Sequence, residues 1–191
     1  MKKLILAVFI MFIGTTSFSQ GLNIDLGVKG GINFSNIRNL PSLNLKYKKG
    51  LQAGVFAGIT FSDKFGVQAD ILFSELGAEI NRAGANFDLN YITVPVVFKY
   101  YLVAEEGFNI QIGPQYGYLL DSELKATIGD EDISTEATQS DLSGVFGVGY
   151  DLPYGIRLDA RYHLGFTDVT GDLKANGRLK YVTITAGFSF L

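Results

Sequence analysis

The chain has no cysteine among its 191 residues. A disulfide framework, a thiolate metal site, a cysteine nucleophile and a lipid anchor on an N-terminal cysteine are therefore excluded. The formal net charge is only −3, which gives no indication of a surface that binds nucleic acid. Beyond the N-terminus, no apolar run reaches the length of a transmembrane helix. No segment has a sustained helical period, so the fold has to be sought in strands.

The N-terminus has the parts of a secretory signal peptide. Two lysines form a basic start, and a short apolar run follows them. Small residues at Ser17 and Ser19 predict cleavage after Ser19. Residues 1–19 are therefore predicted to be a cleaved signal peptide, and residues 20–191 the mature domain. A retained anchor helix is the alternative, but it requires a longer apolar run than this one.

Apolar and polar residues alternate in eight segments of the mature chain. In the last segment, Val182 and Ile184 share one face, whereas Thr183 and Thr185 share the other. A period of two is typical of a strand with one face in an apolar medium. The predicted strands are residues 22–34, 51–61, 65–75, 91–101, 108–118, 142–150, 156–167 and 181–190.

The connections between these segments alternate in length. The short ones are residues 62–64, 102–107 and 151–155, and the long ones are residues 35–50, 76–90, 119–141 and 168–180. An even number of strands of about ten residues, with short and long connections on opposite sides, is typical of outer-membrane barrels. We therefore predict an all-β, eight-stranded antiparallel up-and-down transmembrane β-barrel. The last strand is expected to pair with the first, because a terminal strand otherwise leaves an open edge.

Glycine and aromatic residues indicate which face of the strands is inside. The polar face holds most strand glycines, whereas the bulky apolar face would overfill an eight-stranded barrel. Aromatic residues of the apolar face gather near the strand ends: Phe61, Phe65, Tyr100, Phe108, Tyr150 and Phe190 at the short-turn end, and Phe34, Tyr118 and Phe166 at the other. Such girdles around an aliphatic band favour a bilayer over a soluble lipocalin-like barrel. The predicted location is the outer membrane of a Gram-negative bacterium.

Several sequence blocks also carry a family resemblance. They are the signal-peptide end at residues 17–20, VKGGINFS at 28–35, YITVPVVFKY at 91–100, GPQYGYLL at 113–120 and GVGY at 147–150. In these blocks the chain resembles the small outer-membrane β-barrel family of Bacteroidetes-type bacteria that includes the PorT-like proteins. The resemblance implies a barrel and, for the PorT branch, an association with secretion across the outer membrane. It implies no functional residue here, because membership of a fold does not carry a function over.

Charged residues on the polar face are candidates for a structural network in the lumen. They are Asp25, Lys29, Asp70, Lys99, Arg157, Asp159, Arg161 and His163, with Glu75 as a further pairing partner. Buried charges need partners, so their interleaved signs predict a polar plug rather than an open pore. His163 is the only histidine, and no G-x-S-x-G motif accompanies it. We predict no catalytic residue and no cofactor.

The long connections carry charges of both signs. Basic residues lie where two of them enter strands: Lys46, Lys48 and Lys49 in the first, and Lys174, Arg178 and Lys180 in the last. At the outer end of a barrel these residues would meet lipopolysaccharide phosphates, with solvated loop charge as the alternative. The third connection is acidic, through Asp121, Glu123, Asp130, Glu131, Asp132, Glu136 and Asp141. Its spacing is not that of an EF-hand, so we expect a solvated loop, with calcium binding as the alternative.

The sequence predicts a non-enzymatic protein with a structural, surface-interaction or secretion-support role. Two alternatives stay open, a small pore and an enzyme that modifies outer-membrane lipid. The expected partners are outer-membrane lipid and lipopolysaccharide, secretion or envelope proteins, and the barrel-assembly machinery through the aromatic C-terminal strand. Nucleic acid is not an expected partner.

Overall fold

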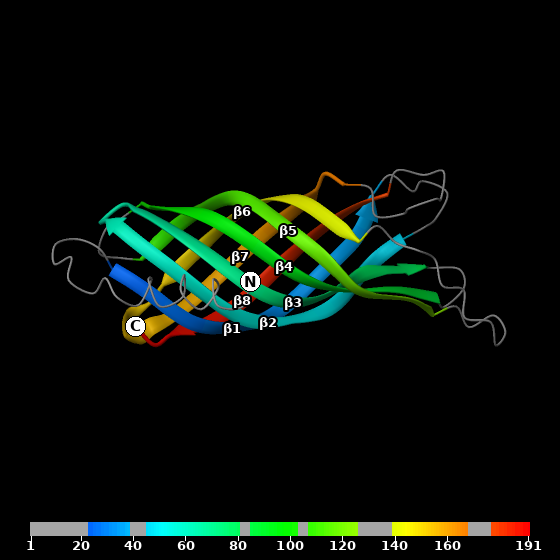
Figure 1. The fold of residues 1–191 in the computed structure, drawn as a ribbon, viewed down its shortest axis with the longest axis horizontal. Coiled ribbons are helices and arrows are strands. Elements are labelled where there is room, and N and C mark those ends of the chain that lie inside the picture. Colours follow the sequence, from blue (N-terminus) through cyan, green and yellow to red (C-terminus); the bar gives the residue numbers. More distant parts are fainter. Residues whose placement is uncertain (1–22, 39–44, 81–84, 103–106, 126–138, 168–176) are drawn as a thin grey trace, which may run out of the picture.

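A computed structural model describes residues 23–38, 45–80, 85–102, 107–125, 139–167 and 177–191 (Figure 1). The elements are β1 (Asn23–Arg38), β2 (Leu45–Ser62), β3 (Phe65–Ile80), β4 (Ala85–Tyr101), β5 (Phe108–Lys125), β6 (Ser140–Asp151), the short turn η1 (Pro153–Gly155), β7 (Ile156–Gly165) and β8 (Arg178–Ser189). Each strand pairs antiparallel with the next, and β8 pairs with β1. The predicted eight-stranded closed barrel, including its seam, is confirmed. The predicted signal peptide lies outside the described residues.

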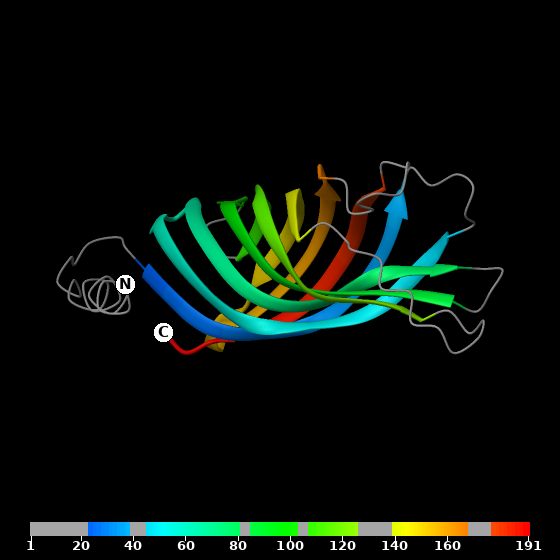
Figure 2. The same ribbon diagram turned by 45° about the vertical axis from the view of Figure 1, so that its right-hand side comes forward.

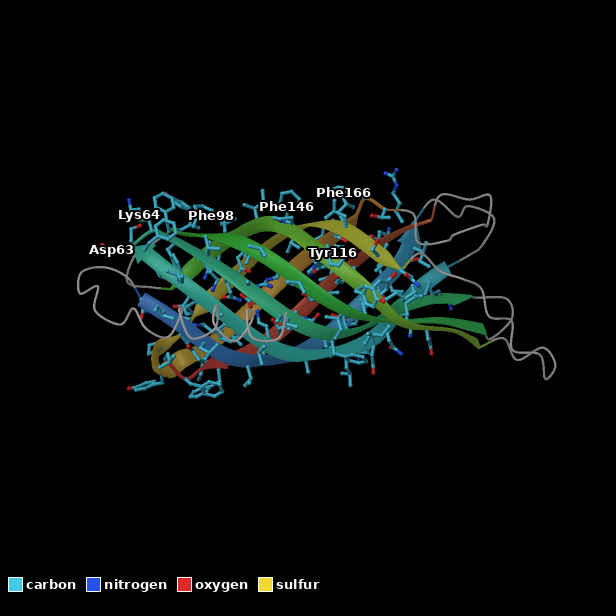
Figure 3. All side chains as sticks on the ribbon, in the orientation of Figure 1. Asp63, Lys64, Phe98, Tyr116, Phe146 and Phe166 are labelled. Atoms are coloured by element: carbon cyan, nitrogen blue, oxygen red, sulfur yellow. The ribbon has the colours of Figure 1, made fainter. Side chains whose placement is uncertain are left out.

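Side chains alternate between the lumen and the outer wall, as the period of two predicts. In β8, Val182 and Ile184 are 37% and 52% exposed, whereas Thr183 and Thr185 are 0% and 4% exposed. Figure 3 shows the labelled Phe98, Phe146 and Phe166 on the outside of the wall. Closure pairs the backbone groups along every strand, which allows this apolar wall to stand in lipid. Among the described residues, no helix is long and apolar enough to cross a membrane.

Aromatic rings pack against one another on the wall at the short-turn end. The ring centroid of Phe65 lies 5.7 Å from that of Phe98 and 5.4 Å from that of Tyr100. The chain also ends at this side of the barrel, beside the turn between β6 and β7 (Figure 1). Aromatic rings in such a belt are suited to the headgroup region of a bilayer.

Glycines on the inner face let bulky groups enter a narrow lumen. Phe56 of β2 faces inward and is buried, although its neighbours on that face are small or polar. A Cβ at Gly27 would lie 2.5 Å from the Phe56 ring. The predicted polar face did not include Phe56, which fills the space that the glycines leave.

The strands extend past their predicted ends on the long-loop side. β3 reaches Ile80 and β4 begins at Ala85, so most of the long connection predicted at residues 76–90 is strand. There the polarity of the two faces inverts. Leu76 and Leu89 are a buried cross-strand pair, whereas Glu75 and Asn90 are a half-buried pair on the outer face. The predicted strand ends were wrong because the prediction required an apolar outer face. Beyond the lipid band, the part of the wall that stands in lipid, the outer face meets water.

Two other strands also extend past their predicted ends on the long-loop side. β2 begins at Leu45 and β5 continues to Lys125, so the long connections predicted at residues 35–50 and 119–141 are also partly strand. In β5 the pairing with β4 shifts by one residue, because Tyr91 pairs with Leu119 while Asn90 pairs with Asp121. The ends of β2, β3, β4 and β5 project beyond the rest of the barrel (Figure 2).

The inward side chains of these extensions form an apolar cluster, called here the long-loop core. Its members are Ile37, Leu76, Ala78, Leu89, Tyr91, Leu179 and Tyr181. All of them come from the long-loop ends of β1, β3, β4 and β8. The prediction of a polar interior is therefore wrong at this end, where the lumen gives way to an apolar core.

Candidate functional site

Four charged side chains meet inside the barrel in what we call the central charge cluster. They are Lys29 of β1, Asp70 of β3, and Asp159 and Arg161 of β7. Lys29 Nζ lies 3.1 Å from Asp70 Oδ2 and 2.7 Å from Asp159 Oδ2. Arg161 reaches the same two carboxylates, at 2.6 Å and 3.5 Å. All four side chains are at most 3% exposed, and their two positive and two negative charges balance.

Two glutamine amides complete this cluster. Gln68 Nε2 donates to Asp70 Oδ1 at 2.7 Å, and Gln111 Nε2 donates to Asp159 Oδ1 at 2.6 Å. Arg161 Nε donates to Gln111 Oε1 at 2.6 Å. Every oxygen of the two carboxylates thus accepts at least one hydrogen bond, which is what a buried charge requires. Sequence reasoning missed the glutamines, although their place on the polar faces of β3 and β5 was visible.

A second balanced group, the short-turn charge cluster, lies nearer the short-turn end. It consists of Asp25, Lys99, Asp151 and Arg157. Arg157 contacts both carboxylates, and Lys99 Nζ lies 3.1 Å from Asp151 Oδ2. Tyr101 Oη donates to the same oxygen at 2.8 Å. Asp151 was expected in a short connection, but it is the last residue of β6 and continues the lumen-facing alternation of that strand.

Glu75 does not join either cluster. It lies on the outer face of β3, and its Oε2 accepts a hydrogen bond of 3.1 Å from the backbone N–H of Leu51. The expectation that it pairs with lumen cations is therefore wrong. Its position in the alternation of β3, two residues after the outward Phe73, explains this placement.

His163 faces the lumen but makes no ion pair within the described residues. Its ring stacks on Tyr181 with centroids 4.1 Å apart, and its Nε2 lies 3.3 Å from Thr183 Oγ1. His163 is 3% exposed and Thr183 is 0% exposed. A catalytic base needs a substrate within reach, so this arrangement suits packing better than acid–base chemistry. Across the described ranges, no group of three or more metal-ligating side chains could hold a metal ion.

Asp141, expected in a solvated acidic loop, lies instead in β6 with its side chain in the lumen. It is 4% exposed, and the Ser143 hydroxyl donates to its Oδ2. In the part of the chain that the structure describes, no cation pairs with Asp141 and its Oδ1 accepts no hydrogen bond. Of the other acidic residues, Asp121 and Glu123 belong to the backbone of β5, and Asp130, Glu131, Asp132 and Glu136 lie outside the described residues.

The predicted lipopolysaccharide contacts separate into different environments. Lys46 and Lys49 are exposed, whereas Arg178 and Lys180 are half-buried. Lys48 is half-buried, with its Nζ 2.6 Å from Asp88 Oδ1 and 3.1 Å from the carbonyl oxygen of Leu76. Lys174 lies outside the described residues.

Solved structures with the same fold are outer-membrane barrels. Neisserial surface protein A matches with a TM-score of 0.56 at 14% identity, over 90% of this chain and 100% of that protein. Ail, the attachment invasion locus protein of Yersinia pestis, was solved with the heparin analogue sucrose octasulfate. It matches with a TM-score of 0.53 at 15% identity, over 88% of this chain and 99% of Ail. No curated protein matches the sequence.

The family relationship comes from the sequence itself. Residues 18–171 match the family described as outer membrane protein beta-barrel domain, which is most of the chain. The apolar outer wall, the charge-filled lumen and the closed eight-stranded topology agree with that match. The chain therefore belongs to the outer membrane protein beta-barrel domain family and lies in the outer membrane of a Gram-negative bacterium.

Proposed function

We propose that this protein is a non-enzymatic outer-membrane barrel of PorT-like type that binds a surface or envelope protein at its long-loop end. The observation that carries the proposal is the extension of β2 to β5 beyond the lipid band. The outer face of this extension is polar at Glu75 of β3 and Asn90 of β4, and the inner face of both strands contributes to the long-loop core. A rigid surface held above the membrane is suited to binding a protein partner. Long loops of bacterial outer-membrane barrels face the outside of the cell.

The two charge clusters have a structural role in this proposal. Their charges are balanced, and the central cluster is closed by hydrogen bonds to glutamines. Phe56 adds an apolar side chain to the same narrow lumen, with Lys29 Nζ 5.5 Å from its ring centroid. A lumen filled in this way holds the barrel rigid beneath the binding surface.

The two alternatives receive less support. A pore requires a water-filled path, whereas paired charges occupy the lumen at two levels. A lipid-modifying enzyme requires a reactive group that lipid can reach, and His163 is buried against Tyr181. Mass analysis of lipid A with and without the protein tests the enzyme alternative, for which an unchanged lipid A is the result expected here.

The experiment that tests the binding role is photo-crosslinking in intact cells. A photoreactive amino acid replaces Asn90, which lies on the outer face of the extended sheet, or Lys64, which is exposed in the turn at the opposite end (Figure 3). We expect a discrete protein adduct from position 90 that position 64 does not give. Adducts to lipid alone, or the same adducts from both positions, would contradict the proposal.

Support of secretion is the function that the PorT-like resemblance adds. It is tested separately, by comparing proteins released by a deletion strain with those released by the complemented strain. Loss of secreted proteins on deletion is the expected result. Normal release together with a crosslinked partner would keep the binding role and reject the secretion role.

A further inference from the structure

We propose that Lys49 and Lys180 form a binding site for a phosphate group of lipopolysaccharide, on the outer wall across the seam of the barrel. The proposal depends on the location of the protein in the outer membrane and not on the protein partner proposed above. It differs from the expectation drawn from the sequence, because it selects two of six basic residues and adds two aromatic rings.

The strand register brings the two lysines to either side of β1. Phe34 of β1 pairs with Lys49 of β2 on one side and with Val182 of β8 on the other. Lys180 pairs with Asn36, two residues further along β1. The alternation places Lys49 beside the outward Phe34, and Lys180 on the same outward face as Val182. Because neighbouring strands lie about 4.8 Å apart and residues rise about 3.4 Å along a strand, the two lysine backbones are separated by roughly 12 Å.

Both ammonium groups lie over aromatic rings. Lys49 Nζ is 6.0 Å from the ring centroid of Phe34, and Lys180 Nζ is 5.6 Å from that of Tyr47. Such contacts hold a cation near a ring face, while the aliphatic stem of the lysine covers apolar surface. Neither lysine forms an ion pair within the described residues, so both charges are available to an anion.

The height of this pair on the wall points to a lipid phosphate. Towards the short-turn end, the outer face continues with apolar side chains such as Leu51 and Ile184, which are 61% and 52% exposed. Towards the other end, the outer face of neighbouring β3 becomes polar at Glu75. The two ammonium groups therefore lie where an apolar wall meets water, at the level of lipid headgroups. At the long-loop end these headgroups belong to the outer leaflet, whose lipopolysaccharide carries phosphates.

Lys48 shows that position in the sequence alone does not define the site. It directly precedes Lys49, but its ammonium group already pairs with Asp88 and donates to the carbonyl oxygen of Leu76. Because a carboxylate already neutralises Lys48, a phosphate on the outer wall is expected to meet Lys49 and not Lys48.

The test is a titration of the folded barrel in phospholipid nanodiscs with purified lipopolysaccharide. In the double variant Lys49→Gln/Lys180→Gln we expect affinity to fall roughly 30-fold, because a basic residue at an anionic surface is worth about a fivefold change in affinity. Lys64→Gln makes the same chemical change at the opposite rim, and we expect it to bind like the wild type. Lys49→Arg/Lys180→Arg retains both charges, so its affinity should stay near that of the wild type.

Two further ligands identify the source of the anion. Dephosphorylated lipopolysaccharide should bind the wild type no better than native lipopolysaccharide binds the double glutamine variant. Inorganic phosphate should not compete at millimolar concentration. Equal affinity of wild type and double glutamine variant, full affinity for the dephosphorylated lipid, or competition by free phosphate would overturn the proposal. Heat-modifiable gel migration of each variant verifies that it is folded, and the dephosphorylated lipid tests the site on the wild type if the glutamine variant does not fold.

Discussion

At the scale of single residues, the central charge cluster makes this barrel sensitive to the loss of one partner. Arg161 contacts Asp70, Asp159 and Gln111, all of them buried. A buried ion pair is weak evidence for stability as a whole, but the removal of one partner leaves an uncompensated charge.

We therefore predict that Arg161→Leu destabilises the protein by about 3–5 kcal/mol. The measurement is the midpoint of urea unfolding in detergent, for which loss of the compact band on gels is the readout. Lys64→Leu, at an exposed turn position, is the control and should leave the midpoint unchanged. An unchanged midpoint for Arg161→Leu would show that the central charge cluster does not hold the barrel together.

For Asp141 we expect that removal of the charge stabilises the protein, in contrast to Arg161. It is a buried carboxylate without a cationic partner in the described residues, and its charge is therefore costly. Asp141→Asn keeps the shape and an acceptor for the Ser143 hydroxyl but removes the charge. We predict a gain in stability of about 1 kcal/mol at neutral pH.

The measurement for Asp141→Asn is the same unfolding midpoint. Asp159→Asn is its comparison, because Asp159 has cationic partners, and that variant should be less stable than the wild type. If Asp141→Asn also lowers the midpoint, a cationic group neutralises Asp141 in the folded protein.

At the scale of secondary-structure elements, β8 closes the barrel and the last residues of the chain complete it. Phe188 pairs with Val28 of β1 and with Ile156 of β7, and the Phe190 N–H donates to the Leu26 carbonyl at 2.7 Å. We predict that deletion of residues 188–191 prevents assembly, because it leaves backbone groups of both β1 and β7 unpaired in lipid. The proposed recognition of the aromatic C-terminus by the barrel-assembly machinery would be lost as well.

Heat-modifiable gel migration of membrane fractions measures assembly of this truncated protein. The full-length double variant Phe188→Leu/Phe190→Leu separates the two causes, since it keeps the backbone pairing but removes the aromatic signal. A truncated protein that still migrates as a compact barrel would contradict the prediction.

An inward glycine of β2 and an outward glycine of β1 are expected to differ in how well the barrel tolerates an added methyl group. A Cβ at the inward Gly54 would lie 2.0 Å from the Ile71 carbonyl oxygen, whereas at the outward Gly30 the nearest atom is 3.6 Å away. We expect Gly54→Ala to cost about 1–3 kcal/mol through overpacking and Gly30→Ala to be nearly neutral. Urea unfolding of both variants compares them directly, and equal midpoints would show that the wall yields easily at Gly54.

At the scale of the whole molecule, the filled lumen predicts a barrel that does not conduct. Paired charges cross the interior between β1, β3 and β7, and a second group joins β1, β4, β6 and β7. Purified protein in a planar bilayer should therefore give no stable conductance steps. Reproducible steps from the wild type would favour the pore alternative, and steps from Arg161→Leu alone would identify the central charge cluster as the barrier.

The agreement between the predicted and the observed orientation of side chains varies along the length of each strand. Within the lipid band, the prediction of inward and outward side chains holds for β1 and β8 residue by residue. Above the band it fails at Leu76 and Leu89, which were assigned to a long connection. Lipid requires an apolar outer face, whereas water does not. A prediction that depends on an apolar outer face therefore ends the strand where water replaces lipid.

The sequence by itself determined that the chain forms eight strands, which of their faces is apolar, and that the barrel lies in the outer membrane. These properties depend on local alternation and on the requirement that every backbone group be paired in lipid. Only the tertiary structure decided which charges meet. Lys29 binds Asp159 across 130 residues of chain, because closure of the barrel brings β1 and β7 together around one lumen. No local pattern contains that pairing, nor the one that joins Lys48 to Asp88 and leaves its neighbour Lys49 exposed beside Phe34.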